Sequence, residues 1–104
     1  SSMSKKTFDI REAKTVLLNQ VDGFSYTVDS SRGDFDSVTV IGPKESLDKI
    51  TLDDFQVEIN VSGLSLMSRS LQSIEVSNIS IVNEEIDDCW IYGKYKTVIV
   101  VSGK

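Results

Sequence analysis

Apolar and polar residues alternate along much of the chain, and this alternation predicts β-strands. It is strictest over residues 55–61, and shorter stretches at residues 24–28 and 37–41 follow the same period. Successive side chains of a strand point to opposite faces, so each stretch offers one apolar face to a core. Residues 97–101 are apolar on both faces, so we expect this stretch to lie centrally in a sheet.

The turn Gly42-Pro43 predicts the start of a short helix. Proline suits the first helical position because the N–H that it lacks would be unpaired there. Residues 44–50 would form the helix, with Leu47 and Ile50 facing inward, and residues 51–54 resemble a capping box around one further turn. The helix and the strands on either side of it fit a compact right-handed crossover.

The N-terminal part of the chain is ambiguous. Residues 7–10 alternate as a first strand would, but residues 10–21 carry apolar side chains at helical spacing as well as strand-forming residues. This segment therefore suits either state. Residues 29–36 and 64–73 are predicted to be loops.

The C-terminal third predicts irregular strands. The apolar positions of residues 74–81 change parity near Asn78, which indicates a β-bulge. Residues 83–88 are expected to form an acidic turn. Residues 90–102 are expected to form a last strand, kinked at Gly93.

These elements predict a mainly β fold of the β-rich α+β type: a small two-layer or barrel-like sheet with one short helix after Gly42-Pro43. The 104 residues suit one domain with one core. The first four residues, Ser-Ser-Met-Ser, look arbitrary. We therefore expect residues 1–6 to be a flexible, vector-derived end and residues 7–104 to be the domain.

Charge argues against a nucleic-acid partner. The 11 basic and 16 acidic residues give a net charge of -5, whereas nucleic-acid affinity comes largely from basic side chains on phosphates. An anionic membrane surface is disfavoured for the same reason. The longest apolar run, residues 98–101, is far shorter than the roughly 20 residues of a membrane helix, so we expect membrane attachment only through other parts of a longer parent protein.

The residue types also argue against catalysis. The chain has no histidine, which removes the common triads and histidine metal sites. Its single cysteine, Cys89, cannot form an internal disulfide and lies beside an apolar strand, where a buried thiol is the simpler interpretation. The glycines form no phosphate-binding loop. We therefore expect no enzyme activity and no cofactor.

Acidic residues are the remaining candidates for a metal or a sugar-cleaving site. Calcium prefers oxygen ligands, but the acidic turn at residues 83–88 lacks the ligand spacing and central glycine of a calcium loop. A solvated turn is therefore the favoured interpretation. A carboxylate pair for glycoside hydrolysis would have little room in so thin a β-structure. The residues considered are Glu84, Glu85, Asp87 and Asp88 in the turn, and Asp34 and Asp36 upstream.

Three aromatic residues near the C-terminus are candidate partner contacts: Trp90, Tyr92 and Tyr95. Trp90 and Tyr92 share one face of the predicted strand, and the face of Tyr95 depends on whether Gly93 shifts the register. Aromatic side chains are frequent at binding hot spots and equally frequent in cores. Both roles stay open for these residues.

One segment resembles a known family. Residues 38–50, Val-Thr-Val-Ile-Gly-Pro-Lys-Glu-Ser-Leu-Asp-Lys-Ile, are similar to the YbbR-like domain, whose repeats carry a strand, Gly-Pro and a short helix ending in Leu-x-x-Ile. The family's second strand and its corner correspond to residues 55–63, and its first strand and turn to residues 16–26. Residues 89–95 differ from the Pro-containing stretch that family repeats often have there.

The resemblance implies a non-catalytic, extracytoplasmic module of a bacterial protein, commonly from Firmicutes. YbbR-like repeats usually stand in tandem outside the cell behind one membrane helix. The best-known members regulate a membrane-bound diadenylate cyclase and thereby cyclic di-AMP signalling. The implied partner is therefore a protein, such as that cyclase, and the family supplies no catalytic, cofactor or metal residues.

Two other interpretations stay open. An immunoglobulin-like or adhesin-type surface spacer would share the β-content but would have no helix after Pro43. A carbohydrate-binding module or a weak enzyme would use the aromatic group Trp90, Tyr92 and Tyr95.

Overall fold

The computed structural model describes residues 3–29, 36–67 and 70–104, without the side chain of Ser70. Most of the loop predicted at residues 29–36, with Asp34, lies outside these residues. Strand makes up 54% of the described residues and helix 8%, so the mainly β prediction is confirmed. The elements are β1 (Met3–Asp9), β2 (Lys14–Leu18), β3 (Phe24–Val28), β4 (Ser37–Pro43), α1 (Lys44–Leu47), the 3-10 helix η1 (Leu52–Asp54), β5 (Phe55–Asn60), β6 (Ser70–Glu75), β7 (Asn78–Ile81), β8 (Trp90–Tyr92) and β9 (Lys96–Gly103).

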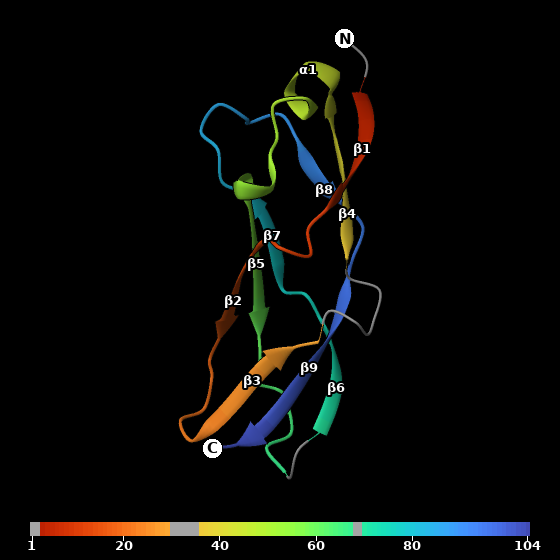
Figure 1. Ribbon diagram of the computed structural model, residues 1–104. Coiled ribbons are helices and arrows are strands. Elements are labelled where there is room, and N and C mark those ends of the chain that lie inside the picture. The colour runs from red at the N-terminus through yellow and green to blue at the C-terminus, as the bar shows by residue number, and fades with distance from the viewer. Residues whose placement is uncertain (1–2, 30–35, 68–69) are drawn as a thin grey trace.

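The strands of the described residues form three sheets of three strands each (Figure 1). Sheet A has the order β1-β4-β8, sheet B the order β2-β5-β7 and sheet C the order β3-β9-β6. Strands β2 and β5 run parallel, and the other neighbouring pairs run antiparallel. The sheets do not close into a barrel. As expected, β9 is the central strand of its sheet.

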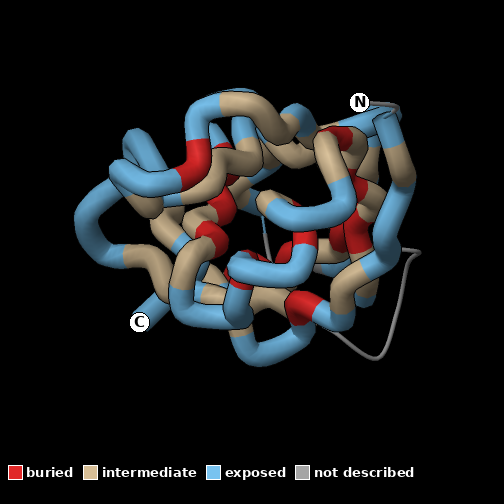
Figure 2. The backbone as a smooth tube through the Cα atoms, turned by 90° about the horizontal axis from the view of Figure 1, so that it is seen from above, coloured by how far each residue is buried: buried red, intermediate tan, exposed pale blue. Residues whose placement is uncertain are grey.

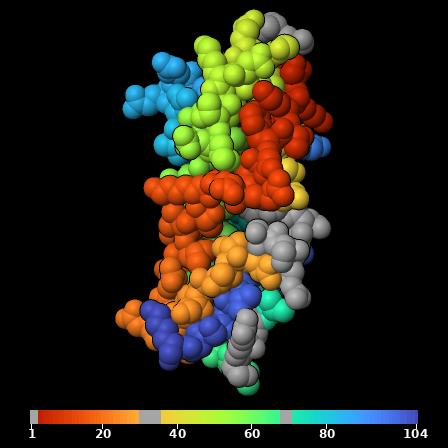
Figure 3. All heavy atoms as spheres, in the orientation of Figure 1, coloured from red at the N-terminus to blue at the C-terminus, as the bar shows by residue number. Residues whose placement is uncertain are grey.

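The molecule is long and narrow. Its principal extents are 52 × 23 × 19 Å, and its Cα radius of gyration is 15.4 Å. A compact domain of this length would have a radius of gyration of about 13 Å. Sheet A and α1 lie at one end, sheet C lies at the other and sheet B lies between them, so β1 begins near one pole and β9 ends near the other (Figure 1). On the face seen in Figure 3, the N-terminal part of the chain runs from the upper right, where β1 lies, across the middle of the molecule.

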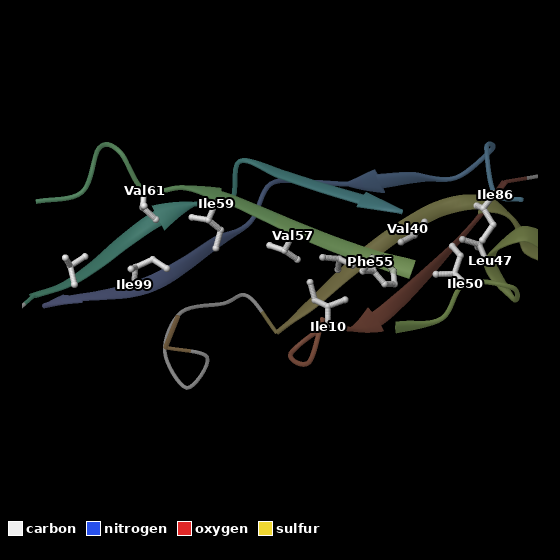
Figure 4. Close-up of a cluster of buried hydrophobic side chains, with 12 residues drawn as sticks. Ile10, Val40, Leu47, Ile50, Phe55, Val57, Ile59, Val61, Ile86 and Ile99 are labelled. Carbon is white, nitrogen blue, oxygen red and sulfur yellow. The ribbon is translucent and has the colours of Figure 1, made fainter. Parts of the chain in front are cut away.

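The core is a row of side chains along the long axis rather than a central ball. Val61, Ile59 and Ile99 lie towards the sheet C end, and Leu47 and Ile50 lie towards the α1 end (Figure 4). Seen down the long axis, the buried segments are surrounded by exposed chain (Figure 2). In β5 the odd-numbered residues are buried and the others are not, as the alternation predicts.

The parity change near Asn78 is a change of sheet and not a bulge. The N–H of Val76 donates to the carbonyl oxygen of Tyr95 at 2.8 Å, on the side of β9. The N–H of the next residue, Ser77, donates to Glu58 of β5 at 3.0 Å. The chain therefore leaves sheet C and enters sheet B between these two residues. The preceding loop also ends earlier than predicted, because β6 begins at Ser70.

The predicted last strand is divided in the same way. Residues 90–92 pair with β4 in sheet A, whereas residues 96–103 form β9 of sheet C. Gly93 lies between them with a φ of 93°, a left-handed conformation that glycine adopts without steric cost. The kink predicted at Gly93 is thus the point at which the chain passes from one sheet to another.

The helix after Pro43 is present but shorter than predicted. Helix α1 has four residues, and Leu47 and Ile50 are both buried, as expected. The turn at residues 51–54 is η1, which has the predicted capping box. The crossover prediction is wrong, because β4 belongs to sheet A and β5 to sheet B, so the helix joins two sheets instead of two strands of one sheet.

The N-terminus also differs from its prediction. Residues 3–6 are not a flexible end: they belong to β1, in which Met3 pairs with Pro43 and Lys6 with Val40. The ambiguous segment after β1 forms a strand, β2, and not a helix. Parallel pairing with β5 stabilises this strand. The vector origin of residues 1–6 stays a prediction.

Candidate interaction surface

The outer face of sheet A gathers aromatic side chains with a lysine. Lys5 of β1 pairs with Ile41 of β4, which pairs with Trp90 of β8. The next row on the same face is formed by Thr7, Thr39 and Tyr92. Directly paired residues point to the same side of a sheet, so these six side chains share one face. We call these six residues the aromatic face.

The two aromatic rings of this face are exposed. Trp90 keeps 56% of its surface exposed and Tyr92 keeps 53%. On the opposite side of the sheet, Val40 is completely buried. The inner side of sheet A therefore supplies the core, and the two aromatic side chains are available for contact with another molecule.

Polar contacts hold the aromatic face in place. The Nζ atom of Lys5 lies 4.5 Å from the centroid of the Tyr92 ring, in a cation–π contact that spans β4. The hydroxyl oxygens of Thr7 and Thr39 are 3.3 Å apart. The rings are thus presented on a paired sheet, which lowers the entropy cost of ordering them when a partner binds.

Tyr95 lies elsewhere and has structural contacts. It is half-buried against the core. Its hydroxyl oxygen accepts the backbone N–H of Thr39 at 3.0 Å, and the hydroxyl donates to the carbonyl oxygen of Tyr92. The phenol therefore joins β4 to the end of β8. Of the three predicted contact residues, the structure brings Trp90 and Tyr92 together and leaves Tyr95 behind them.

Cys89 packs closely against Gly42. A Cβ atom at position 42 would lie only 2.5 Å from the Cys89 Sγ atom and 3.0 Å from the carbonyl oxygen of Asp88. Burial, followed by the negative charge of Asp88 and a hydrogen bond to it, raises the pKa of the Cys89 thiol. The thiol form is favoured, which does not suit a nucleophile.

The acidic residues do not converge on one point. Glu84, Glu85 and Asp87 are exposed in the turn between β7 and β8, and Asp36 is exposed before β4. Within residues 3–29, 36–67 and 70–104, no group of three or more histidine, cysteine or acidic side chains is arranged to hold a metal ion. Over the same residues, no helix is long and apolar enough to cross a membrane.

The sequence pattern indicates only two of the six residues of the aromatic face, Trp90 and Tyr92, and misses the other four. The sequence pattern assigns Lys5 to a flexible end and Thr7 to a first strand. It indicates Thr39 and Ile41 only as strand residues, without a role in a surface. The alternation Met-Ser-Lys-Lys-Thr-Phe at residues 3–8 carries a weak strand signal. Nothing local indicates which strands lie beside it, because the pairing joins β1 to a strand that lies far along the chain, with partners such as Lys5 and Ile41 or Thr7 and Thr39.

The fold and this surface define a mainly β module with an exposed aromatic face. The comparison with protein-family models matches residues 11–100 to the family described as YbbR-like protein. The chain therefore belongs to the YbbR-like family, as its Gly42-Pro43 segment predicts. The comparison with curated protein sequences found no match.

One solved structure is similar to the chain: the solution structure of SuR18C from Streptococcus thermophilus. The sequences are 16% identical, and the TM-score is 0.41. The alignment covers 98% of this chain and 85% of that chain.

Proposed function

We propose that this chain is a protein-contact module of a membrane-anchored bacterial protein, that it acts outside the cytoplasm, and that it regulates a membrane diadenylate cyclase. Membership of the YbbR-like family supports the non-catalytic part. The observation that carries the contact role is the exposure of Trp90 and Tyr92 on one face of sheet A.

The chemistry of the aromatic face suits a protein partner. Tryptophan and tyrosine are enriched at the centres of interfaces, and Trp90 and Tyr92 each still expose more than half of their surface for a partner to cover. A sheet face with two large rings, two threonine hydroxyls and one lysine offers both apolar area and polar contacts at its edge. Truncating such an anchor typically costs about 2 kcal/mol or more of binding free energy.

Co-purification from membranes tests the proposal. The full-length parent protein, tagged and expressed in its own membrane, is expected to bring a diadenylate cyclase with it. The double variant Trp90→Ala with Tyr92→Ala should lose most of the captured cyclase. The matched control is Met67→Ala with Leu71→Ala, which removes exposed apolar side chains outside the aromatic face. Equal capture by both double variants would contradict the contact role of the aromatic face.

Carbohydrate binding is the second candidate. Trp90 and Tyr92 are two residues apart on one strand, so their rings lie side by side, and the apolar faces of sugar rings can pack on such a surface. Titration with cell-wall glycans, followed by the fluorescence of the single tryptophan, tests this alternative. An unchanged emission spectrum at saturating glycan would remove it.

The immunoglobulin-like spacer interpretation predicts that no helix follows Pro43. Helix α1 follows Pro43 directly, and three small sheets replace the two large sheets of a sandwich. The spacer interpretation thus has no specific support in this fold.

A further inference from the structure

A groove of about 520 Å³ separates the edges of sheets A and B. Residues of β7 line it on one side and residues of β8 line it on the other. Among the described strands, β7 pairs only with β5, and β8 pairs only with β4. The two long walls of the groove are therefore the open edges of two different sheets.

The edges offer backbone groups to an added strand. Residues of an antiparallel strand alternate between bonding to their neighbour and pointing their N–H and C=O away from it. The N–H of Val82 donates to the carbonyl oxygen of Asp54, the residue directly before β5, at 2.6 Å and so continues the pairing of β7 with β5 by one residue. By alternation, Ile81 and Ile79 are expected to turn their backbone groups away from β5, towards the groove. Such unpaired rows are templates for a further strand.

These two edges lack the charged residues that commonly block strand addition. The edge strand β1 carries Lys5, Lys6 and Asp9, whereas β7 reads Asn-Ile-Ser-Ile and β8 reads Trp-Ile-Tyr. Charged side chains, lysine above all, are a common device for keeping edge strands unpaired. Because neither β7 nor β8 carries a charged side chain, this device does not block the addition of a strand to either edge.

Charge and burial define what the groove would accept. Ile86 on its wall is only 7% exposed, and Ile91 and Cys89 beside it are half-buried, so these apolar side chains lie beside polar ones in a mixed lining. The charged residues of the lining are Glu75 and Asp87, with Lys94 as the single base. The neighbouring turn adds further carboxylates, and the whole chain has a charge of -5. A basic segment is electrostatically favoured over an acidic one.

We propose that the groove takes an extended, basic peptide segment of a partner protein, which adds as a strand between β7 and β8. Main-chain hydrogen bonds would supply the affinity, apolar side chains would face the interior, and a basic side chain would lie near Asp87. Both edges are short, with four residues in β7 and three in β8, so we expect weak binding by a short peptide. This proposal rests on the proposed function in one respect, namely that the module contacts a protein.

Titration of the isotope-labelled chain by NMR tests the inference. The probe is the terminally blocked peptide Lys-Val-Thr-Val-Lys. It is expected to shift the amide signals of Ile79, Ile81 and Ile91 progressively. A peptide with glutamate in place of both lysines should bind more weakly, and a peptide N-methylated at its central residues should cause no shifts, because it cannot donate strand hydrogen bonds.

A charge variant tests the role of the Asp87 carboxylate in the groove lining. Asp87→Asn should weaken binding of the basic peptide about twofold to fivefold at low salt, as for an exposed ion pair. The matched control, Asp53→Asn, makes the same change at an exposed residue that does not line the groove, and should leave the affinity unchanged.

Three results would overturn the inference: no shifts at millimolar peptide, equal binding of the N-methylated peptide, or shifts that avoid β7 and β8. The proposed function fails separately, because it is tested by co-purification of the cyclase and not by the amide signals of this groove.

Discussion

At the scale of single residues, position 42 has no room for a side chain. Gly42 is buried in β4, and the segment Asp88–Cys89 passes directly over it. The Gly-Pro pair thus has two separate roles: glycine allows this close approach, and Pro43, with a φ of -61°, ends the strand and starts α1.

Gly42→Ala is expected to destabilise the fold by about 1–3 kcal/mol, the usual cost of overpacking a core. Urea unfolding should show a lower midpoint with an unchanged slope. Gly63→Ala is the matched control, because a Cβ atom at position 63 would meet nothing within 4 Å. Equal midpoints for the two variants would contradict this account of the Gly-Pro segment.

The exposed pair Asp9 and Arg11 makes a prediction about pH. The Arg11 side chain and its backbone N–H donate hydrogen bonds to the Asp9 carboxylate and lower the pKa of Asp9 from 3.8 to about 2. Because the folded pKa lies below the unfolded one, the pair stabilises the fold above about pH 4, and the stabilisation is lost as the pH falls towards 2. Carboxyl NMR titration should show the low pKa of Asp9, and Arg11→Gln should return it towards 3.8. An unchanged Asp9 pKa in that variant would be the contrary result.

At the scale of elements, hydrogen bonds of Asp54 join η1 to the segment that follows β7. The carboxylate of Asp54 accepts the backbone N–H of Thr51 at 2.8 Å and the side-chain amide of Asn83 at 3.3 Å. The backbone carbonyl of Asp54 accepts the N–H of Val82. Asp54 therefore both caps η1 and bonds it to the segment that follows β7.

Asp54→Ala should cost about 1–2 kcal/mol of stability, the usual loss on removing a helix cap. The neighbouring variant Asp53→Ala changes an exposed carboxylate and should stay within about 0.5 kcal/mol of the parent chain. Thermal unfolding of both variants measures the difference. A smaller loss for Asp54→Ala than for Asp53→Ala would show that this connection is unimportant.

Element types were more predictable than their partners. Both alternation and an apolar run are local properties: alternation correctly indicates β5, and the apolar residues on both faces of 97–101 correctly indicate the central strand β9. The parity change near Asn78 was visible, but a bulge and a change of sheet give the same pattern in sequence. The difference depends on whether Val76 and Ser77 bond to one strand or to two, and those strands are distant in the chain.

The candidate surface shows the same limit of local patterns. The exposed pair Trp90 and Tyr92 could be proposed from strand periodicity, since both lie on one face. Separation of Tyr95 from them required the left-handed turn at Gly93, and the contribution of Lys5 required the register between β1 and β4. Both are set by tertiary structure.

At the scale of the whole molecule, elongation is the distinctive property. The chain runs from one small sheet into another along a row, which gives a thin molecule whose core is spread along its 52 Å length. Such a shape places sheet A, with its aromatic face, far from sheet C. A module of this form can hold one contact surface away from its opposite end.

Small-angle X-ray scattering should detect this elongation. The protein in dilute solution should give a radius of gyration near or slightly above the 15.4 Å of its Cα atoms. The distance distribution should have a long tail. A symmetric distribution with a radius of gyration near the roughly 13 Å of a compact domain would contradict the arrangement of the sheets.

The central claim is that the aromatic face contacts a protein partner, and site-specific photo-crosslinking in the native membrane tests it most directly. A photoreactive phenylalanine analogue would replace Trp90 or Tyr92 in the full-length parent, with Leu71, exposed on β6 of sheet C, as the control position. Irradiation is predicted to join positions 90 and 92 to a diadenylate cyclase and to leave position 71 uncrosslinked. Crosslinks to the cyclase from position 71 alone, or from no position, would contradict the claim.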